Sequence, residues 1–139
     1  MITENDMKPT ELRIGNLVMY NGEVVRVEQI TKKKIGYHRH KGETRMNYAR
    51  LFEIEPIPIT EELLLKIGFK KDVDANSLYR YAIDNCLFEV RLWDSGILIK
   101  LENYCEDCVR KVHLPKTPNL HQLQNAYYLA TGKELEIEL

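Results

Sequence analysis

Hydrophobic and polar positions alternate in short runs along the first third of the chain, and this pattern predicts β-strands. The apolar runs 17–20 and 23–27 flank Asn21-Gly22. Asn-Gly suits a two-residue hairpin turn because both central residues need a positive φ. Pairing across this turn sets Val18 opposite Val25. The face that we expect to be buried carries Val18, Tyr20, Val25 and Val27.

Two further strands and a third shorter one are predicted after this hairpin. Residues 35–40 and 44–48 form a second hairpin, and residues 51–55 form a strand that Pro56 and Pro58 end, because proline cannot donate a hydrogen bond to a ladder. Five short strands in about fifty residues predict a small twisted antiparallel barrel of SH3-like type.

A short helix is predicted after Thr60, whose hydroxyl can cap a free amide at the helix start. Leu63, Leu64 and Ile67 form its apolar side, and Gly68 is placed to end it in the left-handed conformation. The two elements that follow are an antiparallel sheet and a second helix.

Alternation predicts the sheet, with a fourth strand at residues 109–114. Its expected buried positions are Tyr79, Tyr81, Ile83, Phe88, Val90, Leu92, Ile97, Ile99 and Leu101. The second helix is expected over residues 120–131, with Asn119 and Gln122 as a capping box. Residues 135–139 are interpreted as a tail or a short edge strand.

The predicted fold class is therefore α+β. Residues 1–11 are expected to form a flexible arm, residues 12–59 an SH3-like β lobe, and residues 60–139 an antiparallel sheet with two helices. We expect the two lobes to pack as one unit, because each alone would be marginal in size. The hydrophobic fraction of 44% is ordinary, and no apolar run approaches the ~18 residues of a membrane span. The expected location is cytoplasmic, without membrane association.

Charge is distributed unevenly along the chain, and one segment is strongly basic. The net charge is −1 overall, yet residues 32–50 carry seven basic residues and one acidic residue. Lysines and arginines on a hairpin can replace the counterions of a phosphate backbone, and tyrosines can stack on bases. The alternative is a solvated hairpin whose charge blocks edge pairing. The candidate nucleic-acid surface comprises Lys32, Lys33, Lys34, Tyr37, Arg39, Lys41, Arg45, Tyr48 and Arg50.

Two other groups of residues have the spacing of metal ligands. Cys105 and Cys108 form a C-x-x-C motif, but the histidines downstream do not complete a zinc pattern. Glu106 and Asp107 disfavour the thiolate that redox chemistry needs. The residues 38–40 read His-Arg-His, which we interpret as surface residues of the basic hairpin. No metal site and no cofactor are expected.

No catalytic motif is present in the sequence. The chain has two serines, neither in a G-x-S-x-G context, and it has no phosphate-binding glycine motif. We therefore expect a protein that is not an enzyme. On the second helix, His121, Gln122, Gln124 and Asn125 flank the apolar stripe. They are read either as a protein-contact surface or, preferably, as helix capping with a solvated face.

Three stretches of the chain resemble an uncharacterised family of small proteins of Bacteroides-type bacteria and their phages and mobile elements. The stretches are residues 11–18, residues 56–62 running on to 68–69, and residues 121–127 with 131–135. The resemblance implies a mobile-element setting and assigns no activity. We therefore expect a non-enzymatic interaction or accessory protein of a phage or mobile element, whose partner is an unknown protein or a second copy. The alternative is a nucleic-acid-binding module that uses the hairpin 32–50.

Overall fold

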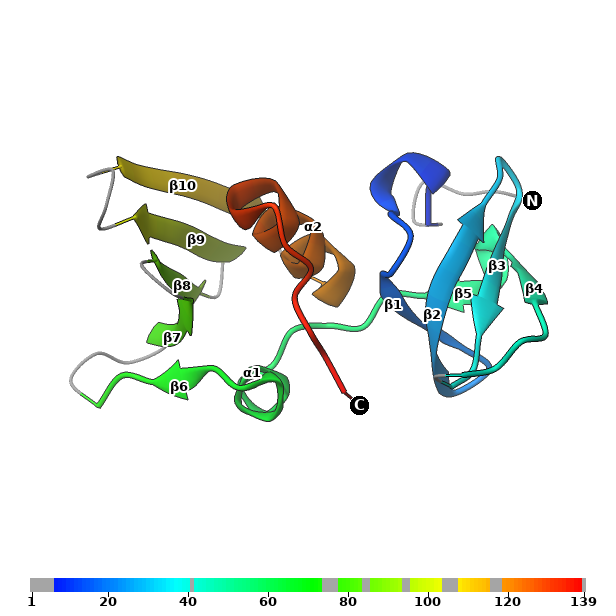
Figure 1. Ribbon diagram of the computed structural model, residues 1–139, viewed down its shortest axis with the longest axis horizontal. Helices are drawn as coiled ribbons and strands as arrows, with labels where there is room; N and C mark the ends of the chain where they lie inside the picture. The colour runs from blue at the N-terminus through cyan, green and yellow to red at the C-terminus, as the bar shows by residue number, and fades with distance from the viewer. Residues whose placement is uncertain are drawn as a thin grey trace. The chain divides into compact units, whose positions relative to one another are not determined.

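The computed structural model describes residues 7–40, 42–73, 78–83, 86–93, 96–103, 108–115 and 119–138. Its fold is α+β, with two five-stranded antiparallel sheets and two α-helices in these residues (Figure 1). The chain divides into two compact units. The first comprises Met1–Ile57 and Asn119–Asn125, and the second comprises Pro58–Pro118 and Ala126–Leu139.

The first unit contains a curled sheet with the strand order β4-β3-β2-β1-β5. Its elements are the 3-10 helix η1 (Pro9–Glu11), β1 (Leu17–Tyr20), β2 (Glu23–Ile30), β3 (Lys34–His38), β4 (Asn47–Arg50), the 3-10 helix η2 (Leu51–Glu53) and β5 (Ile54–Glu55). The hairpin at Asn21-Gly22 is confirmed: both residues have positive φ, and Val18 pairs with Val25. The strand predicted at 51–55 is only partly correct, because Leu51–Glu53 forms η2 and only Ile54–Glu55 pairs, with β1.

A β-bulge bends the longest strand of this sheet. The register of β2 against β3 shifts between Val27 and Gln29, and such a shift increases the local twist of the strand. The bend lets the sheet curl around one core (Figure 1). The core cluster contains Met7, Leu12, Val18, Val25, Val27, Ile35, Tyr37, Ala49, Leu51 and Ile54. Met7 is therefore part of the core, although the arm predicted over residues 1–11 includes it.

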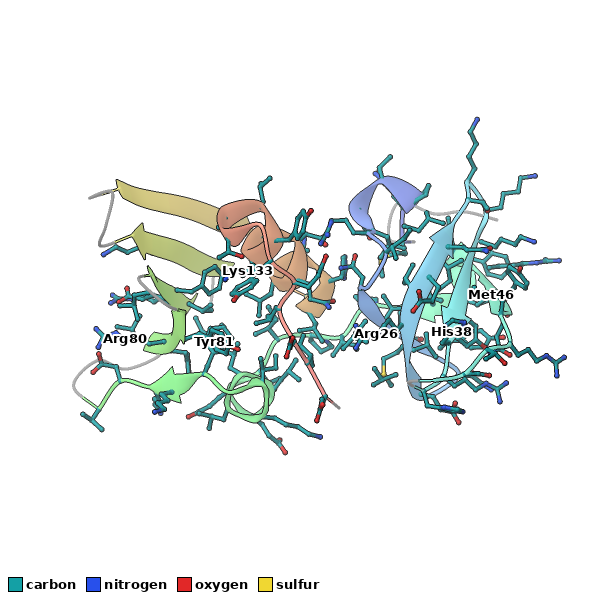
Figure 2. The ribbon with its side chains drawn as sticks, viewed as in Figure 1. Arg26, His38, Met46, Arg80, Tyr81 and Lys133 are labelled. Carbon is teal, nitrogen blue, oxygen red and sulfur yellow. The ribbon has the colours of Figure 1, made fainter. Side chains whose placement is uncertain are left out.

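The second unit contains the sheet with order β10-β9-β8-β7-β6. Its elements are α1 (Glu61–Ile67), β6 (Lys70–Lys71), β7 (Leu78–Ile83), β8 (Cys86–Trp93), β9 (Gly96–Asn103) and β10 (Cys108–Pro115). The meander and its fourth strand are confirmed, whereas β6 was not predicted. Arg80 and Tyr81 point to opposite sides of β7, as alternation requires (Figure 2).

Aromatic side chains form the centre of the second unit. The ring of Phe88 is 5.1 Å from Tyr127 and 6.2 Å from Phe69, measured between centroids. On the opposite face, the Arg80 side chain makes ion pairs with Asp72 at 2.9 Å and Glu89 at 3.1 Å. The predicted division of this sheet into one apolar and one charged face is therefore confirmed in part: Phe88 and Val90 are buried, but Leu78 is also buried although it shares the side of Arg80 on β7.

The two helices form where the sequence predicts them. Thr60 accepts a hydrogen bond from the Leu63 amide at 3.1 Å, and Gly68 ends α1 with φ +120°. The helix α2 spans Leu120–Thr131, and Gln122 accepts a hydrogen bond from the Asn119 amide at 2.8 Å. Residues 134–138 form no strand, but Leu135 and Ile137 are buried. Neither helix of the described chain is long and apolar enough to cross a bilayer.

Candidate nucleic-acid interface

The turn between β2 and β3 presents two lysines at its tip. The Thr31 hydroxyl accepts hydrogen bonds from the backbone amides of Lys33 at 3.4 Å and Lys34 at 3.1 Å. The Thr31 amide donates to the Lys34 carbonyl at 2.9 Å and closes the turn. The threonine hydroxyl thus satisfies the backbone of the turn, and the side chains of Lys32 and Lys33 are exposed to solvent.

Two cation–aromatic pairs lie next to this turn. Lys34 pairs across the strands with Arg50. The Lys34 ammonium lies 4.6 Å from the centre of the Tyr48 ring, and the Arg50 guanidinium lies 5.9 Å from the centre of the Phe52 ring. Both rings keep much of their surface in solvent, at 52% exposed for Tyr48 and 47% for Phe52. Exposed rings alternate here with exposed cations.

These six residues define a surface that we call the basic–aromatic patch: Lys32, Lys33, Lys34, Tyr48, Arg50 and Phe52. Within the described residues, its four cations make no ion pair with a carboxylate. The acid nearest in sequence is Glu53, which accepts a hydrogen bond from the Arg50 backbone amide at 3.3 Å. The patch is therefore a local concentration of positive charge on a chain whose net charge is −1.

The other predicted basic residues lie at the far end of β3. Arg39 and Arg45 are exposed in the loop between β3 and β4, and Arg39 lies five residues from Lys34, about 16 Å along the strand. Glu43 occupies this loop and accepts hydrogen bonds from the Arg39 amide at 2.6 Å and the Asn47 side chain at 3.0 Å. The Arg39 amide is the main cause that lowers the pKa of Glu43, and Asn47 contributes next. Lys41 lies outside the described residues.

The structure corrects the role expected for Tyr37. Its side chain is 3% exposed and belongs to the core of the first unit, where its ring is 5.5 Å from that of Tyr20. It is not available to stack on a base. The signal was present in the sequence, because Ile35 and Tyr37 are two residues apart on one strand and therefore share a face. Phe52 is the exposed ring that the prediction missed, since η2 replaces the strand expected there.

The other predicted sites gain no support as metal centres. His38 lies 3.6 Å from the Glu28 carboxylate, on the outer side of β2 and β3 (Figure 2). Cys105 lies outside the described residues, and Cys108 opens β10. Among the side chains that the structure describes, no group of three or more His, Cys, Asp or Glu residues gathers as metal ligands.

A recess of about 420 Å³ lies beside the turn between β1 and β2. Its lining residues are Met19, Tyr20, Asn21, Gly22, Glu53 and Glu55. It presents two carboxylates and a tyrosine, but no histidine, serine or cysteine that would supply a nucleophile with its base. The lining of the recess therefore does not suit nucleophilic catalysis.

Polar residues of α2 are buried, which corrects the preferred reading of a solvated face. Gln124 is 1% exposed. Its side-chain oxygen accepts from the Leu17 amide at 2.8 Å, and its nitrogen donates to the Gly15 carbonyl at 3.1 Å. Asn125 accepts from the Asn16 side chain at 2.8 Å and donates to the Glu11 carbonyl at 3.0 Å. These two side chains therefore hold the segment that leads into β1 against α2.

His121 is also buried, at 1% exposed. Its Nε2 atom lies 3.8 Å from a Glu11 carboxylate oxygen, and its Nδ1 atom has no hydrogen-bond partner within the described structure. Burial lowers the pKa of His121 from 6.5 to about 4, because a charged imidazolium loses its hydration there. The residue is neutral at pH 7 and acts in packing.

No protein-family model, no curated protein and no solved structure matches this chain. The basic–aromatic patch therefore stands on its own geometry as the candidate interface.

Proposed function

We propose that the protein is a non-enzymatic module that binds nucleic acid through the phosphates, using the basic–aromatic patch. The observation that carries this proposal is the convergence of four cations, without a partner carboxylate in the described residues, beside two exposed rings. Cations that are not neutralised internally can replace condensed counterions on a phosphate backbone. A mobile-element accessory role is consistent with such a module.

The number of cations bounds the strength of the interaction. Four phosphate contacts correspond to a slope of log K against log salt of about −2.8 for a single strand and about −3.6 for B-form DNA. The rest of the chain opposes binding, since the whole carries a charge of −1. The affinity therefore depends on the patch and falls steeply with added salt.

We also propose that the curled sheet of the first unit is an SH3-like barrel. The strand order β4-β3-β2-β1-β5 and the single turn of 3-10 helix between β4 and β5 support this assignment. In such a small barrel, strands β3 and β4 present their outer side chains to solvent. That side carries Lys34, Tyr48 and Arg50.

A protein partner or a second copy of the chain is the second candidate, and exposed apolar residues on α2 favour it. Leu129 is 79% exposed and Tyr128 is 41% exposed. A Leu129→Ser and Tyr128→Ser double variant tests self-association. Sedimentation that depends on concentration in the wild type, and not in this variant, would support this second candidate.

The test of the nucleic-acid proposal is a titration of labelled 20-residue oligonucleotides at two salt concentrations. The test variant carries Lys32→Gln, Lys33→Gln and Lys34→Gln. The control variant carries Lys8→Gln, Lys66→Gln and Lys70→Gln, three exposed lysines outside the patch. We expect the test variant to bind more weakly and to reduce the magnitude of the salt slope by about 2.

The control variant separates specific contacts from overall charge, since both variants lose three positive charges. Equal losses in the two variants would contradict an assignment to the patch. Absence of binding by the wild type at low salt, where phosphate contacts are strongest, would remove nucleic acid as the ligand.

A further inference from the structure

The two rings of the patch indicate which form of nucleic acid, single-stranded or duplex, the patch binds. Lysines and arginines alone contact the phosphates of single strands and duplexes alike. Tyr48 and Phe52 are different, because a large exposed ring gains little from a phosphate and much from the flat face of a base. A duplex hides the faces of its bases in the stack, whereas a single strand presents them.

The geometry places each ring beside a cation. Lys34 lies against the Tyr48 ring at 4.6 Å, and Arg50 lies near the Phe52 ring at 5.9 Å. Each pair therefore combines a stacking surface with a donor that can reach the phosphate of the same nucleotide.

The two rings lie on consecutive elements of the chain. Tyr48 and Arg50 are two residues apart on β4 and point to the same side. Phe52 follows on η2, directly after the strand ends. The order along the surface is thus ring, cation, ring, with Lys32 and Lys33 at the adjoining turn.

We infer that the patch binds single-stranded nucleic acid, with one base on Tyr48, a second base on Phe52, and the connecting phosphates held by Lys34 and Arg50. This inference rests on the proposed function, which requires only that phosphates be bound. It names the substrate class, a single strand with unpaired bases, and assigns the rings a role that charge does not supply.

The experiment compares a labelled 20-residue single strand with the duplex of the same sequence, at one low salt concentration. The test variant is Tyr48→Leu with Phe52→Leu, which keeps apolar volume and removes the rings. The control is Ile14→Ala, which removes an exposed apolar side chain of the same unit that is 60% exposed. A 20-residue polyglutamate serves as an anion without bases.

We expect the single strand to bind more tightly than the duplex. Loss of each ring should weaken single-strand binding by about 5- to 150-fold, with the salt slope unchanged because no phosphate contact is lost. The control variant should bind as the wild type does. Circular dichroism and the unfolding midpoint show whether the double leucine variant keeps its fold. A single Tyr48→Phe variant, which retains a ring at this position, should keep most of the wild-type affinity.

Three results would overturn the inference, each in a different way. Equal binding of strand and duplex, with wild-type affinity in the double leucine variant, would leave phosphate binding intact and remove stacking. Polyglutamate binding as tightly as the single strand would show that the patch accepts any extended anion. Absence of all binding at low salt would remove the proposed function itself.

Discussion

The side-chain oxygen of Gln124 accepts a hydrogen bond from the backbone amide of Leu17 at 2.8 Å, across 107 residues of sequence. The same side chain donates to the Gly15 carbonyl. A buried amide side chain that satisfies two backbone groups fixes the start of β1 against the first half of α2. The first unit is thus completed by a segment from near the end of the chain.

Replacing Gln124 with methionine should destabilise the protein. The buried Leu17 amide would lose its partner, and an unsatisfied buried group costs about 1–3 kcal/mol, whereas the half-buried Gly15 carbonyl keeps the hydrogen bond from the Arg26 side chain at 3.1 Å. We expect a loss of about 2 kcal/mol in the free energy of unfolding, measured by urea denaturation. Leu129→Ala, a change at an exposed position of the same helix, should stay within about 0.5 kcal/mol. Similar losses in both variants would argue against the Gln124 contacts.

The buried His121 makes stability dependent on acid. Its pKa is about 4 in the folded protein and 6.5 as an ordinary histidine, so the unfolded chain binds the proton first as the pH falls. Stability from this group is fully present above pH 6.5 and is lost as the pH falls toward 4, by up to roughly 3 kcal/mol. The facing charged group is Glu11, whose Oε1 lies 3.8 Å from Nε2.

The variant His121→Leu isolates this effect, because other groups titrate in the same range. The measurement is the free energy of unfolding at pH 7.5 and at pH 4.5 for both proteins. We expect the wild type to lose more stability than His121→Leu between these two pH values. Parallel losses would show that His121 does not titrate as its burial implies.

Glu43 should organise the loop between β3 and β4 in its charged form. Its pKa is lowered from 4.5 chiefly by the hydrogen bond from the Arg39 amide. The bond is therefore present above pH 4.5 and is lost as the pH falls through the lowered pKa. We expect the NMR shift of the Arg39 amide to titrate with a midpoint below 4.5. Glu43→Gln should abolish that titration, and a midpoint at or above 4.5 would contradict the contact.

Gly68→Ala should destabilise the end of α1. Gly68 has φ +120°, and an added Cβ would lie 3.5 Å from the Tyr81 ring, which is an ordinary contact. The cost is therefore one of backbone strain, about 1–2 kcal/mol. Thermal unfolding should show a lowered midpoint, whereas Lys66→Ala, at an exposed position of the same helix, should have a much smaller effect. An unchanged midpoint would mean that the backbone relaxes at this position.

Much of the secondary structure could be predicted because its signals are local. Asn21-Gly22 selects its turn through φ, Thr60 caps α1 through its own hydroxyl, and the bounds of α2 follow from residues within the helix and next to it. The alternation of apolar residues likewise predicted the strands of both sheets. The short strand β6 was missed, since two consecutive lysines carry no alternating pattern.

The candidate site was predicted only in outline. The sequence showed a run of basic residues. In the structure these residues lie at the two ends of β3. Spacing along the chain does not reveal which of these ends lies beside exposed aromatic rings. Phe52 belongs to the patch because η2 interrupts the strand expected over residues 51–55. Tyr37 does not belong to the patch, because its side chain lies on the face of β3 that packs into the core.

The turns, the caps, the two helices and the apolar faces follow from the sequence, since they depend on the conformational preferences of neighbouring residues. The environments of His121 and Gln124 follow only from the folded chain. Both are polar residues whose burial is tolerated only where a distant segment supplies partners or excludes water. Gly15 and Leu17 supply those partners to Gln124, and residues so far apart in the sequence carry no local signal of the contact.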